Sequence, residues 1–371
     1  MLESVRDMVL QEDLEIIANA KELQWSALEG NTILITGATG LVGSQLVKAI
    51  ACRNRLFHSN INVLACIRNT EKAKIIYADL YDGGLLRENI EFVVGDISSP
   101  NFTENFFKDE NGSRIVDFII HTASTTASKE FVTCPVEVIK TTLDGTQNIL
   151  EIARKCNSRG VVYLSSMEAF GVMPPSEKRA TENELGYVDL TSPRSCYPEG
   201  KRMAECICSA YAKEYNVPVK VARLSQTFGS GITYTENRVF AQFAKAAIEG
   251  HDIVLHTKGL SWGNYCYTRD TITAILMLLV KGNAGEAYTI ANEETNVRIK
   301  DMAQLVAYKI AGGKIKVVFD IPESALTYGY APDTELHLSS RKMQALGWKP
   351  TVSLEETYRR MMKSMLSSRE S

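Results

Sequence analysis

A tyrosine and a lysine four residues apart give the strongest chemical signal in this sequence. Tyr197 and Lys201 stand in the run Tyr197-Pro-Glu-Gly-Lys201, at the start of a segment with helical periodicity. Residues four apart lie on one face of a helix. A free tyrosine has a pKa of about 10, too high for a base at neutral pH, but a neighbouring ammonium favours the phenolate. The pair therefore predicts proton transfer by Tyr197, with Lys201 as its electrostatic partner.

Ser166 completes the expected catalytic set. It ends the apolar run 160–166, which is typical of a buried strand that precedes the tyrosine helix. Its hydroxyl is placed to hydrogen-bond a reacting carbinol oxygen while Tyr197 carries the proton, which predicts hydride transfer to or from a nicotinamide. Glu168 has two open interpretations: acid or base catalysis, or a carboxylate that binds a substrate hydroxyl.

A glycine-rich turn indicates where the dinucleotide binds. It follows the apolar run 32–36 and precedes a helical pattern. Glycine lets the backbone turn tightly and approach a pyrophosphate, and the helix N-terminus adds free N–H groups and a favourable dipole. The predicted cofactor contacts in this turn are Gly37, Thr39, Gly40, Leu41, Val42 and Gly43.

The end of the second expected strand, 61–67, bears on the choice of cofactor. NAD-preferring folds usually place a carboxylate there, whereas an arginine suits the 2′-phosphate of NADP. Ile67 stands at that point and Arg68 follows it. The sequence therefore favours NADP, with NAD as the alternative. An arginine that only stacks on the adenine or points to solvent also remains open.

The ends of the following strands supply the other expected cofactor contacts. Asp96 and Ile97 are expected near the adenine, and residues after the strand at 116–121 are expected near the nicotinamide. His121 is interpreted as a structural residue at a strand end rather than a base. The contacts expected after it are Thr122, Ala123 and Ser124, and Tyr197 and Lys201 are expected to touch the cofactor too.

Short apolar strands alternate with helices over much of the chain, which predicts an α/β fold with a parallel sheet buried on both faces. We expect a doubly wound Rossmann domain over 31–224, whose loop 172–196 reaches a smaller, mainly substrate-binding α/β lobe over 225–371. Residues 1–30 are expected to form a helical extension with one apolar face. Whether that face packs on its own domain or on a partner subunit is open. The face consists of Leu10, Leu14, Ile17 and Leu23.

Composition excludes several functions. The net charge is −3 with no long basic stretch, which argues against nucleic-acid binding. No apolar run reaches the roughly 20 residues of a membrane span, and the acidic N-terminus does not resemble a secretory signal, so we expect a cytoplasmic protein. The 8 cysteines are scattered, without a pattern that suggests a metal site.

These motifs together resemble the extended short-chain dehydrogenases of the NAD-dependent epimerase/dehydratase family. The resemblance runs from about residue 31 to 350 and includes Gly145-Thr146 and the runs 164–171 and 346–350. The run 197–205 is especially similar to UDP-glucuronate decarboxylases. The resemblance implies a nucleotide-activated sugar as substrate. It also implies a homodimer built from two helices of each subunit, at about 135–155 and 198–215.

The chain departs from the family at three substrate-side positions. Met167 stands where 4,6-dehydratases carry an aspartic acid that protonates the leaving hydroxyl, so simple dehydration is disfavoured. Gly263 stands where an arginine usually holds the diphosphate or a sugar acid, and Gln226 replaces an asparagine. Arg238 and His256 are candidates for phosphate and base contacts instead, although a solvent-facing arginine and a packed histidine are equally compatible. The expected substrate contacts are Ser124, Ser166, Glu168, Gln226, Arg238 and His256.

Three functions remain open at this point. The first is an epimerase- or decarboxylase-like enzyme that oxidises a nucleotide-linked sugar, rearranges it and returns the hydride. The second is an NADPH-dependent reductase of a nucleotide-linked ketose or keto-sugar, which Arg68 favours. The third is a non-catalytic dinucleotide-binding regulatory protein, against which the intact set of serine, tyrosine and lysine argues.

Overall fold

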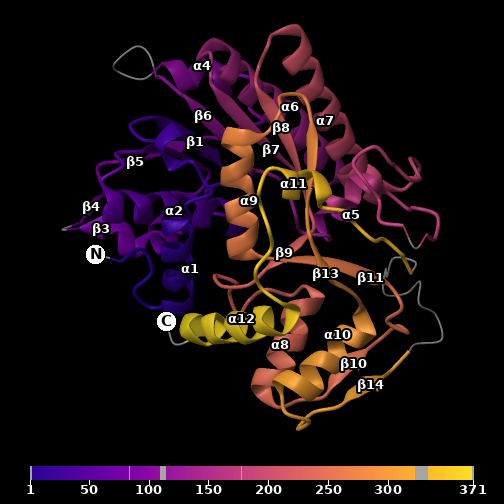
Figure 1. Ribbon diagram of the computed structural model, residues 1–371. Coiled ribbons are helices and arrows are strands. Elements are labelled where there is room, and N and C mark those ends of the chain that lie inside the picture. Colours follow the sequence, from indigo (N-terminus) through magenta and orange to yellow (C-terminus); the bar gives the residue numbers. More distant parts are fainter. Residues whose placement is uncertain (1, 83, 109–113, 177, 322–332, 370–371) are drawn as a thin grey trace.

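A computed structural model describes residues 2–82, 84–108, 114–176, 178–321 and 333–369. A large sheet with helices on both faces makes up the upper part of Figure 1, and a smaller lobe lies below it. Within the described ranges, no helix is long and apolar enough to cross a membrane.

The large sheet has seven strands, and all neighbouring strands run parallel. Their order across the sheet is β12-β8-β7-β6-β1-β2-β5. This arrangement confirms the predicted doubly wound sheet. The chain winds in opposite directions from β1, so a crevice opens between β1 and β6 at their carboxyl ends. The strands are β1 (Thr32–Thr36), β2 (Asn62–Ile67), β5 (Ile90–Val94), β6 (Phe118–His121), β7 (Gly160–Ser166), β8 (Val219–Leu224) and β12 (Ala287–Ile290).

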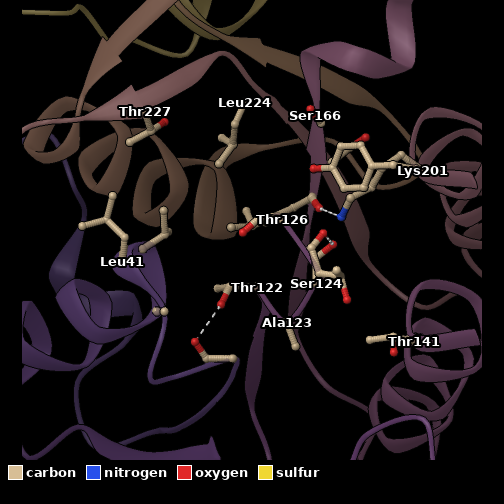
Figure 2. Close-up of a pocket in the computed structure, with 18 of the residues that line it drawn as sticks. Leu41, Thr122, Ala123, Ser124, Thr126, Thr141, Ser166, Lys201, Leu224 and Thr227 are labelled. Carbon is tan, nitrogen blue, oxygen red and sulfur yellow. Dashed lines mark hydrogen bonds between the residues drawn. The ribbon is translucent and has the colours of Figure 1, made fainter. Parts of the chain in front are cut away.

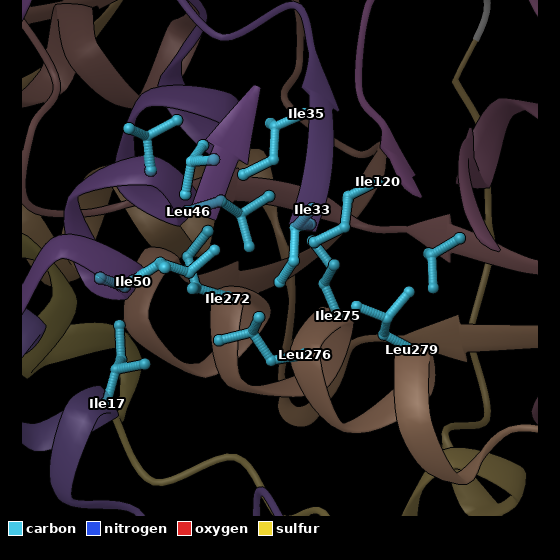
Figure 3. Packing of buried hydrophobic residues seen from close by; sticks show 14 of the residues in the cluster. Ile17, Ile33, Ile35, Leu46, Ile50, Ile120, Ile272, Ile275, Leu276 and Leu279 are labelled. Carbon is cyan, nitrogen blue, oxygen red and sulfur yellow. The ribbon is translucent and has the colours of Figure 1, made fainter. Parts of the chain in front are cut away.

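Helices cover both faces of this sheet because every central strand is apolar on both sides. In β1, Ile33 and Ile35 belong to one buried cluster, while Leu34 belongs to the cluster on the opposite face. Helices α2 (Leu41–Phe57) and α9 (Thr268–Lys281) cover the first face; α4 (Phe102–Phe107), α6 (Pro135–Lys155) and α7 (Cys196–Glu214) cover the second. Figure 3 shows the first cluster, including Ile33, Ile35, Leu46, Ile50, Ile120, Ile272, Ile275, Leu276 and Leu279.

Helix α9 and strand β12 lie beyond residue 224, in the part of the chain that the sequence assigned mainly to the smaller lobe. Strand β12 pairs with β8 at the edge of the large sheet. Helix α9 is buried along nearly its whole length, from Ile272 to Leu279. A helix that is apolar on most sides needs cover from more than one direction, and the sheet on one side and α1 and α2 on the other provide it.

The smaller lobe combines two small sheets with helices. A three-stranded sheet has the order β13-β11-β9, and a parallel pair joins β10 and β14. Its core contains the stacked rings of Phe228 and Phe240, with Tyr265 and Tyr358 packed edge-on against Phe228. The elements are β9 (Gln226–Phe228), α8 (Val239–Glu249), β10 (Ile253–Leu255), β11 (Trp262–Tyr267), β13 (Asn292–Arg298), α10 (Ile299–Leu305), β14 (Val317–Phe319) and α12 (Leu354–Arg369).

Shorter elements connect these, among them α3 (Thr70–Ile76), β3 (Tyr81–Asp82), β4 (Leu85–Leu86), α5 (Glu130–Thr133), the turn η4 (Pro193–Ser195) and α11 (Arg341–Ala345). The loop 172–196 contacts residues of the smaller lobe. Ala180 N–H donates to the His337 carbonyl at 2.7 Å, and Arg179 pairs with Glu293 at 3.0 Å.

The N-terminal extension packs on its own chain. Helix α1 (Met8–Asn19) begins after Asp7, whose carboxylate accepts a hydrogen bond from the Leu10 N–H. The apolar face expected from the sequence is buried, with Leu14 and Ile17 fully covered. The helix contacts α2, α9 and α12, so it lies where the large sheet meets the smaller lobe.

A buried carboxylate ties this helix to the rest of the molecule. One Asp13 oxygen accepts hydrogen bonds from Ser230 and Tyr267, both at 2.6 Å. The other accepts from Arg269 at 3.0 Å and Arg360 at 2.9 Å. Because the Asp13 side chain is 1% exposed, its charge depends on these four donors for stabilisation.

Asp13→Ala should lower the free energy of unfolding by about 3 to 5 kcal/mol, since it leaves two partly buried arginines without their shared carboxylate. Urea unfolding would measure the change. The matched control is Glu12→Ala, because Glu12 also pairs with Arg360 but is 59% exposed; it should cost less than about 1 kcal/mol. Equal effects of the two substitutions would refute the structural role of Asp13.

Candidate active site

A cavity of about 440 Å³ lies at the carboxyl ends of the large sheet's strands. It spans the crevice between β1 and β6, where ligands bind in doubly wound sheets. In Figure 2, Leu41 and Lys201 lie on opposite sides of it, with Ser124 and Thr126 between them. Every predicted cofactor contact borders the cavity: Gly37, Thr39, Gly40, Leu41, Val42, Gly43, Arg68, Asp96, Ile97, Thr122, Ala123, Ser124, Tyr197 and Lys201.

The glycine turn packs so closely that side chains would not fit at two positions. Gly37 has a φ of +61°, and a Cβ there would lie 2.7 Å from the Ala123 Cα. A Cβ on Gly43 would lie 2.4 Å from the Gly37 carbonyl oxygen. Helix α2 therefore begins directly against the turn, and its N-terminal N–H groups border the cavity. This is the geometry that a pyrophosphate requires.

His121 holds the ends of β1 and β6 together rather than acting on a ligand. Its Nδ1 lies 2.7 Å from the Thr36 hydroxyl and its Nε2 lies 3.3 Å from the Thr146 hydroxyl. Thr36 in turn accepts a hydrogen bond from the Ala123 N–H at 3.1 Å. Burial, and then the charge of Lys201, lower the pKa of His121 to about 3, so the ring is neutral at physiological pH.

The predicted catalytic residues converge at the other end of the cavity. Ser166 ends β7, while Tyr197 and Lys201 share a face of α7. Hydrogen bonding by the Ser166 side chain is among the influences that lower the pKa of the Tyr197 phenol. The Lys201 Nζ lies 5.7 Å from the centre of the tyrosine ring and donates to the Leu164 carbonyl at 2.8 Å. Figure 2 shows this lysine contact as a dashed line.

Burial controls the charge of both catalytic side chains. Tyr197 is 8% exposed and Lys201 is 2% exposed. Burial, and then the charge of Glu168, raise the pKa of Tyr197 to about 12, although Ser166, Arg238 and Arg194 oppose the shift. Burial lowers the pKa of Lys201 to about 8, with Glu205 opposing it. The sequence predicted that the lysine would favour the phenolate. Burial instead opposes the phenolate, because it is the largest cause of the raised pKa of Tyr197.

Glu168 has a partner that the sequence did not indicate. Its two carboxylate oxygens accept hydrogen bonds from the two terminal nitrogens of Arg194, at 2.9 and 3.3 Å. Its backbone N–H donates to the Ser166 hydroxyl at 3.2 Å. Arg194 precedes helix α7 in the turn η4. No spacing rule connects positions 168 and 194, so only the fold could reveal this pair.

The predicted substrate contacts divide into two groups. Ser124, Ser166, Glu168, Gln226 and Arg238 border the cavity. The sixth, His256, does not border it: the Nδ1 of this half-exposed residue lies 3.0 Å from the Asp320 carbonyl oxygen. It follows strand β10, whose pairing with β14 directs this segment away from the large sheet.

The adenosine end of the cavity carries opposite charges. Arg68 is exposed and borders it. Burial alone would raise the pKa of Asp96, but hydrogen bonds from Ser98 and the charge of Arg68 together lower it. Lys72, which the sequence did not single out, adds a second cation to the lining.

Tyr265 explains why an arginine is absent from position 263. A Cβ on Gly263 would lie 2.2 Å from the Tyr265 hydroxyl oxygen. The register between β11 and β13 shifts between these two residues, and Tyr265 is buried in the core of the smaller lobe. A side chain at position 263 would therefore require the Tyr265 ring to shift.

Several lining residues were missed by the sequence analysis. The run Ser124-Thr-Thr-Ala-Ser128 follows β6 and supplies a series of hydroxyl groups, which its composition alone could have indicated. Phe131 also borders the cavity and stacks on Tyr197, with ring centres 4.4 Å apart. Within the described parts of the chain, no cluster of three or more potential ligands suits a metal ion.

The lining fits a nicotinamide dinucleotide. The turn at Gly37 and Gly43 leaves backbone where side chains would otherwise lie, and helix α2 begins beside it. The buried hydroxyl of Ser225, at the other end, has no hydrogen-bond partner among the described residues. A polar ligand atom would supply the missing partner.

Residues 33–291 match the model of the NAD dependent epimerase/dehydratase family. The chain belongs to this family. The resemblance drawn from the motifs is thereby confirmed, and with it an NAD-dependent enzyme.

Known members of the family resemble the chain over most of its length. UDP-glucuronic acid decarboxylase 1 of Danio rerio is 28% identical over 324 residues, covering 87% of this chain and 70% of that protein. UDP-glucuronic acid decarboxylase 6 of Arabidopsis thaliana is 28% identical over 336 residues, covering 87% and 85%. The UDP-glucose 4-epimerase of Thermotoga maritima, solved with UDP-glucose, shares the fold with a TM-score of 0.72 at 22% identity, covering 91% and 99%.

The neutral His121 predicts a specific pH dependence. Because its pKa is about 3 in the folded chain and about 6.5 when unfolded, its contribution to stability is complete above pH 6.5 and is lost as pH falls toward 3. Between pH 6.5 and 5, the unfolding free energy should fall by up to about 1.4 kcal/mol per pH unit more in the wild type than in His121→Gln. His251→Gln, at a histidine 75% exposed, should keep the wild-type slope; identical slopes in all three proteins would contradict this prediction.

Proposed function

We propose that this family member oxidises a carbinol of a nucleotide-linked sugar, rearranges the product and returns the hydride, as an epimerase does. The observation that carries the proposal is the single cavity that joins the glycine turn to Ser166, Tyr197 and Lys201. The hydroxyl-rich run 124–128 borders the same cavity, and such groups suit a sugar. The names of the relatives support a nucleotide sugar.

The roles of the catalytic side chains follow from their positions. A bound nicotinamide dinucleotide would accept and return the hydride. Ser166 would hold the carbinol oxygen, and Tyr197 would take its proton. Lys201 lies behind the tyrosine ring and stabilises the phenolate as it forms. Since burial and the charge of Glu168 raise the pKa of Tyr197, a ligand that adds positive charge would favour proton transfer.

Dehydration and decarboxylation have less support. Met167 borders the cavity where a dehydratase needs an acid for the leaving hydroxyl, and a thioether has no proton to donate. Gly263 lacks the arginine that would hold a sugar acid, and Tyr265 fills the space beside it. The proposal therefore differs from the decarboxylase names of the relatives.

A second candidate is a net reductase of a nucleotide-linked ketose or keto-sugar. The exposed Arg68 at the end of β2 favours it, because an arginine there suits the 2′-phosphate of NADP. We propose NADP as the preferred cofactor for the same reason, with NAD as the alternative. A recycling epimerase keeps its dinucleotide through turnover, whereas a net reductase must exchange it.

We further propose a homodimer that pairs helices α6 and α7 of two subunits. Val136 and Ile139 on α6 and Met203 on α7 are exposed apolar residues, and such a patch suits a protein contact.

A cytoplasmic location agrees with the buried thiols of Cys52 and Cys208, which pack as core residues.

Tyr197→Phe should reduce turnover by about 100-fold or more, the scale of acid–base catalysis, while dinucleotide affinity stays nearly unchanged. The substrate for this assay would come from a thermal-shift screen of UDP-, CDP-, GDP- and dTDP-sugars. Tyr211→Phe, on the same helix but outside the cavity, should retain activity. Near-normal turnover of Tyr197→Phe would remove the central claim.

Arg68→Ala should weaken NADP binding about 10- to 100-fold and NAD binding far less, because a charge-assisted contact is worth about 1.5 to 3 kcal/mol. Fluorescence titration with NADPH and NADH would give both affinities in one protein. Equal weakening of the two, or a wild-type preference for NADH, would show that Arg68 does not read the 2′-phosphate.

A further inference from the structure

The Glu168 carboxylate borders the reacting end of the cavity, and Arg194, which is not among the lining residues, pairs with it. Both oxygens of the carboxylate and both terminal nitrogens of the guanidinium take part, at 2.9 and 3.3 Å. Glu168 lies two residues after Ser166 and borders the cavity. This fork is the geometry with which an arginine recognises any carboxylate, including one on a ligand.

Arg194 also belongs to the layer that covers the catalytic tyrosine. Its guanidinium carbon lies 5.8 Å from the centre of the Phe131 ring. Phe131 stacks on Tyr197 with an angle of 13° between the rings. The charges of Glu168 and Arg194 both act on the tyrosine, in opposite directions. A sugar placed against Tyr197 is therefore within the field of this pair.

Among the described residues, four cations line the cavity. Lys201 donates to the Leu164 carbonyl. Arg238 pairs with Glu236 at 2.7 Å through one terminal nitrogen, which leaves other donors for a diphosphate. The remaining two cations of the lining, Arg68 and Lys72, belong to the adenosine end. The stretches outside the described ranges contain no lysine, arginine or histidine.

We propose that Glu168 neutralises Arg194, the arginine that a sugar acid would need as its partner. The site would then select nucleotide sugars that are uncharged at the reacting end. This inference rests on the proposed function and narrows its substrate class. A uronate carboxylate would meet a guanidinium already neutralised by Glu168 and would lie close to a second negative charge. Two neighbouring carboxylates in a partly buried site oppose each other's ionisation. A neutral sugar meets no such repulsion, and its hydroxyls can donate to the lone pairs that remain on Glu168.

The test compares UDP-glucose with UDP-glucuronic acid, two ligands that differ at one carbon. If neither UDP-sugar binds, glucose and glucuronic acid linked to the other nucleotides take their place. Isothermal titration in a Tyr197→Phe background, saturated with dinucleotide, measures affinity without turnover. The neutral sugar should bind about tenfold or more tighter than the acid. Glu168→Gln frees Arg194 and should raise affinity for the acid about tenfold or more, with little gain for the neutral sugar.

Two further variants separate the pair from general electrostatics. Adding Arg194→Gln to Glu168→Gln should abolish the gain in acid affinity. Glu199→Gln removes the same charge from helix α7, where Glu199 pairs with Arg202 instead, and should produce no gain. Tighter binding of the acid by the parent protein, or no gain in Glu168→Gln, would overturn the inference while leaving the proposed function in place. Failure of every nucleotide sugar to bind would overturn both.

Discussion

The burial of Lys201 beneath Tyr197 is the constraint on which the rest of the site depends. A lysine with 2% exposure loses most of its hydration, and its ammonium donates a hydrogen bond to the Leu164 carbonyl. The same burial disfavours the phenolate of Tyr197, whose pKa rises to about 12. Positive charge brought near Tyr197 by a ligand would favour the phenolate.

The cavity itself depends on contacts between segments that are far apart in the chain. The cavity lies at one edge of the large sheet. An edge strand of that sheet, β12, comes from residues 287–290, far along the chain from the other strands. Residues of the smaller lobe line another side of the cavity. Asp13 in the N-terminal helix accepts hydrogen bonds from Tyr267 and Arg360 of that lobe. The loop 172–196 crosses between the two parts through Ala180. The N-terminal extension thus has a structural task, because it supports the relative position of sheet and lobe.

The positive charge at the sugar end comes from a different position than the family resemblance implied. Tyr265 fills the space beside Gly263, which precludes an arginine there without disrupting the core. A guanidinium nevertheless stands near the reacting group, because Arg194 approaches from the turn before helix α7. It is neutralised by Glu168. A site that keeps the cation but pairs it with its own carboxylate differs chemically from one that offers the cation to a substrate.

The sequence by itself determined the fold class and the glycine turn, and it predicted many of the residues that line the cavity, among them Ser166, Tyr197 and Lys201, because these depend on local periodicity and on motifs read within a few residues. The strand alternation, the i,i+4 spacing of Tyr197 and Lys201 and the glycine triplet each express one short-range physical rule. Only the tertiary structure decided the pairing of Glu168 with Arg194, the distance of His256 from the cavity and the docking of helix α1 on its own chain. Those outcomes depend on how segments tens or hundreds of residues apart pack together. No local sequence pattern encodes such packing. The burial of a side chain, which influences its charge, likewise depends on the whole fold.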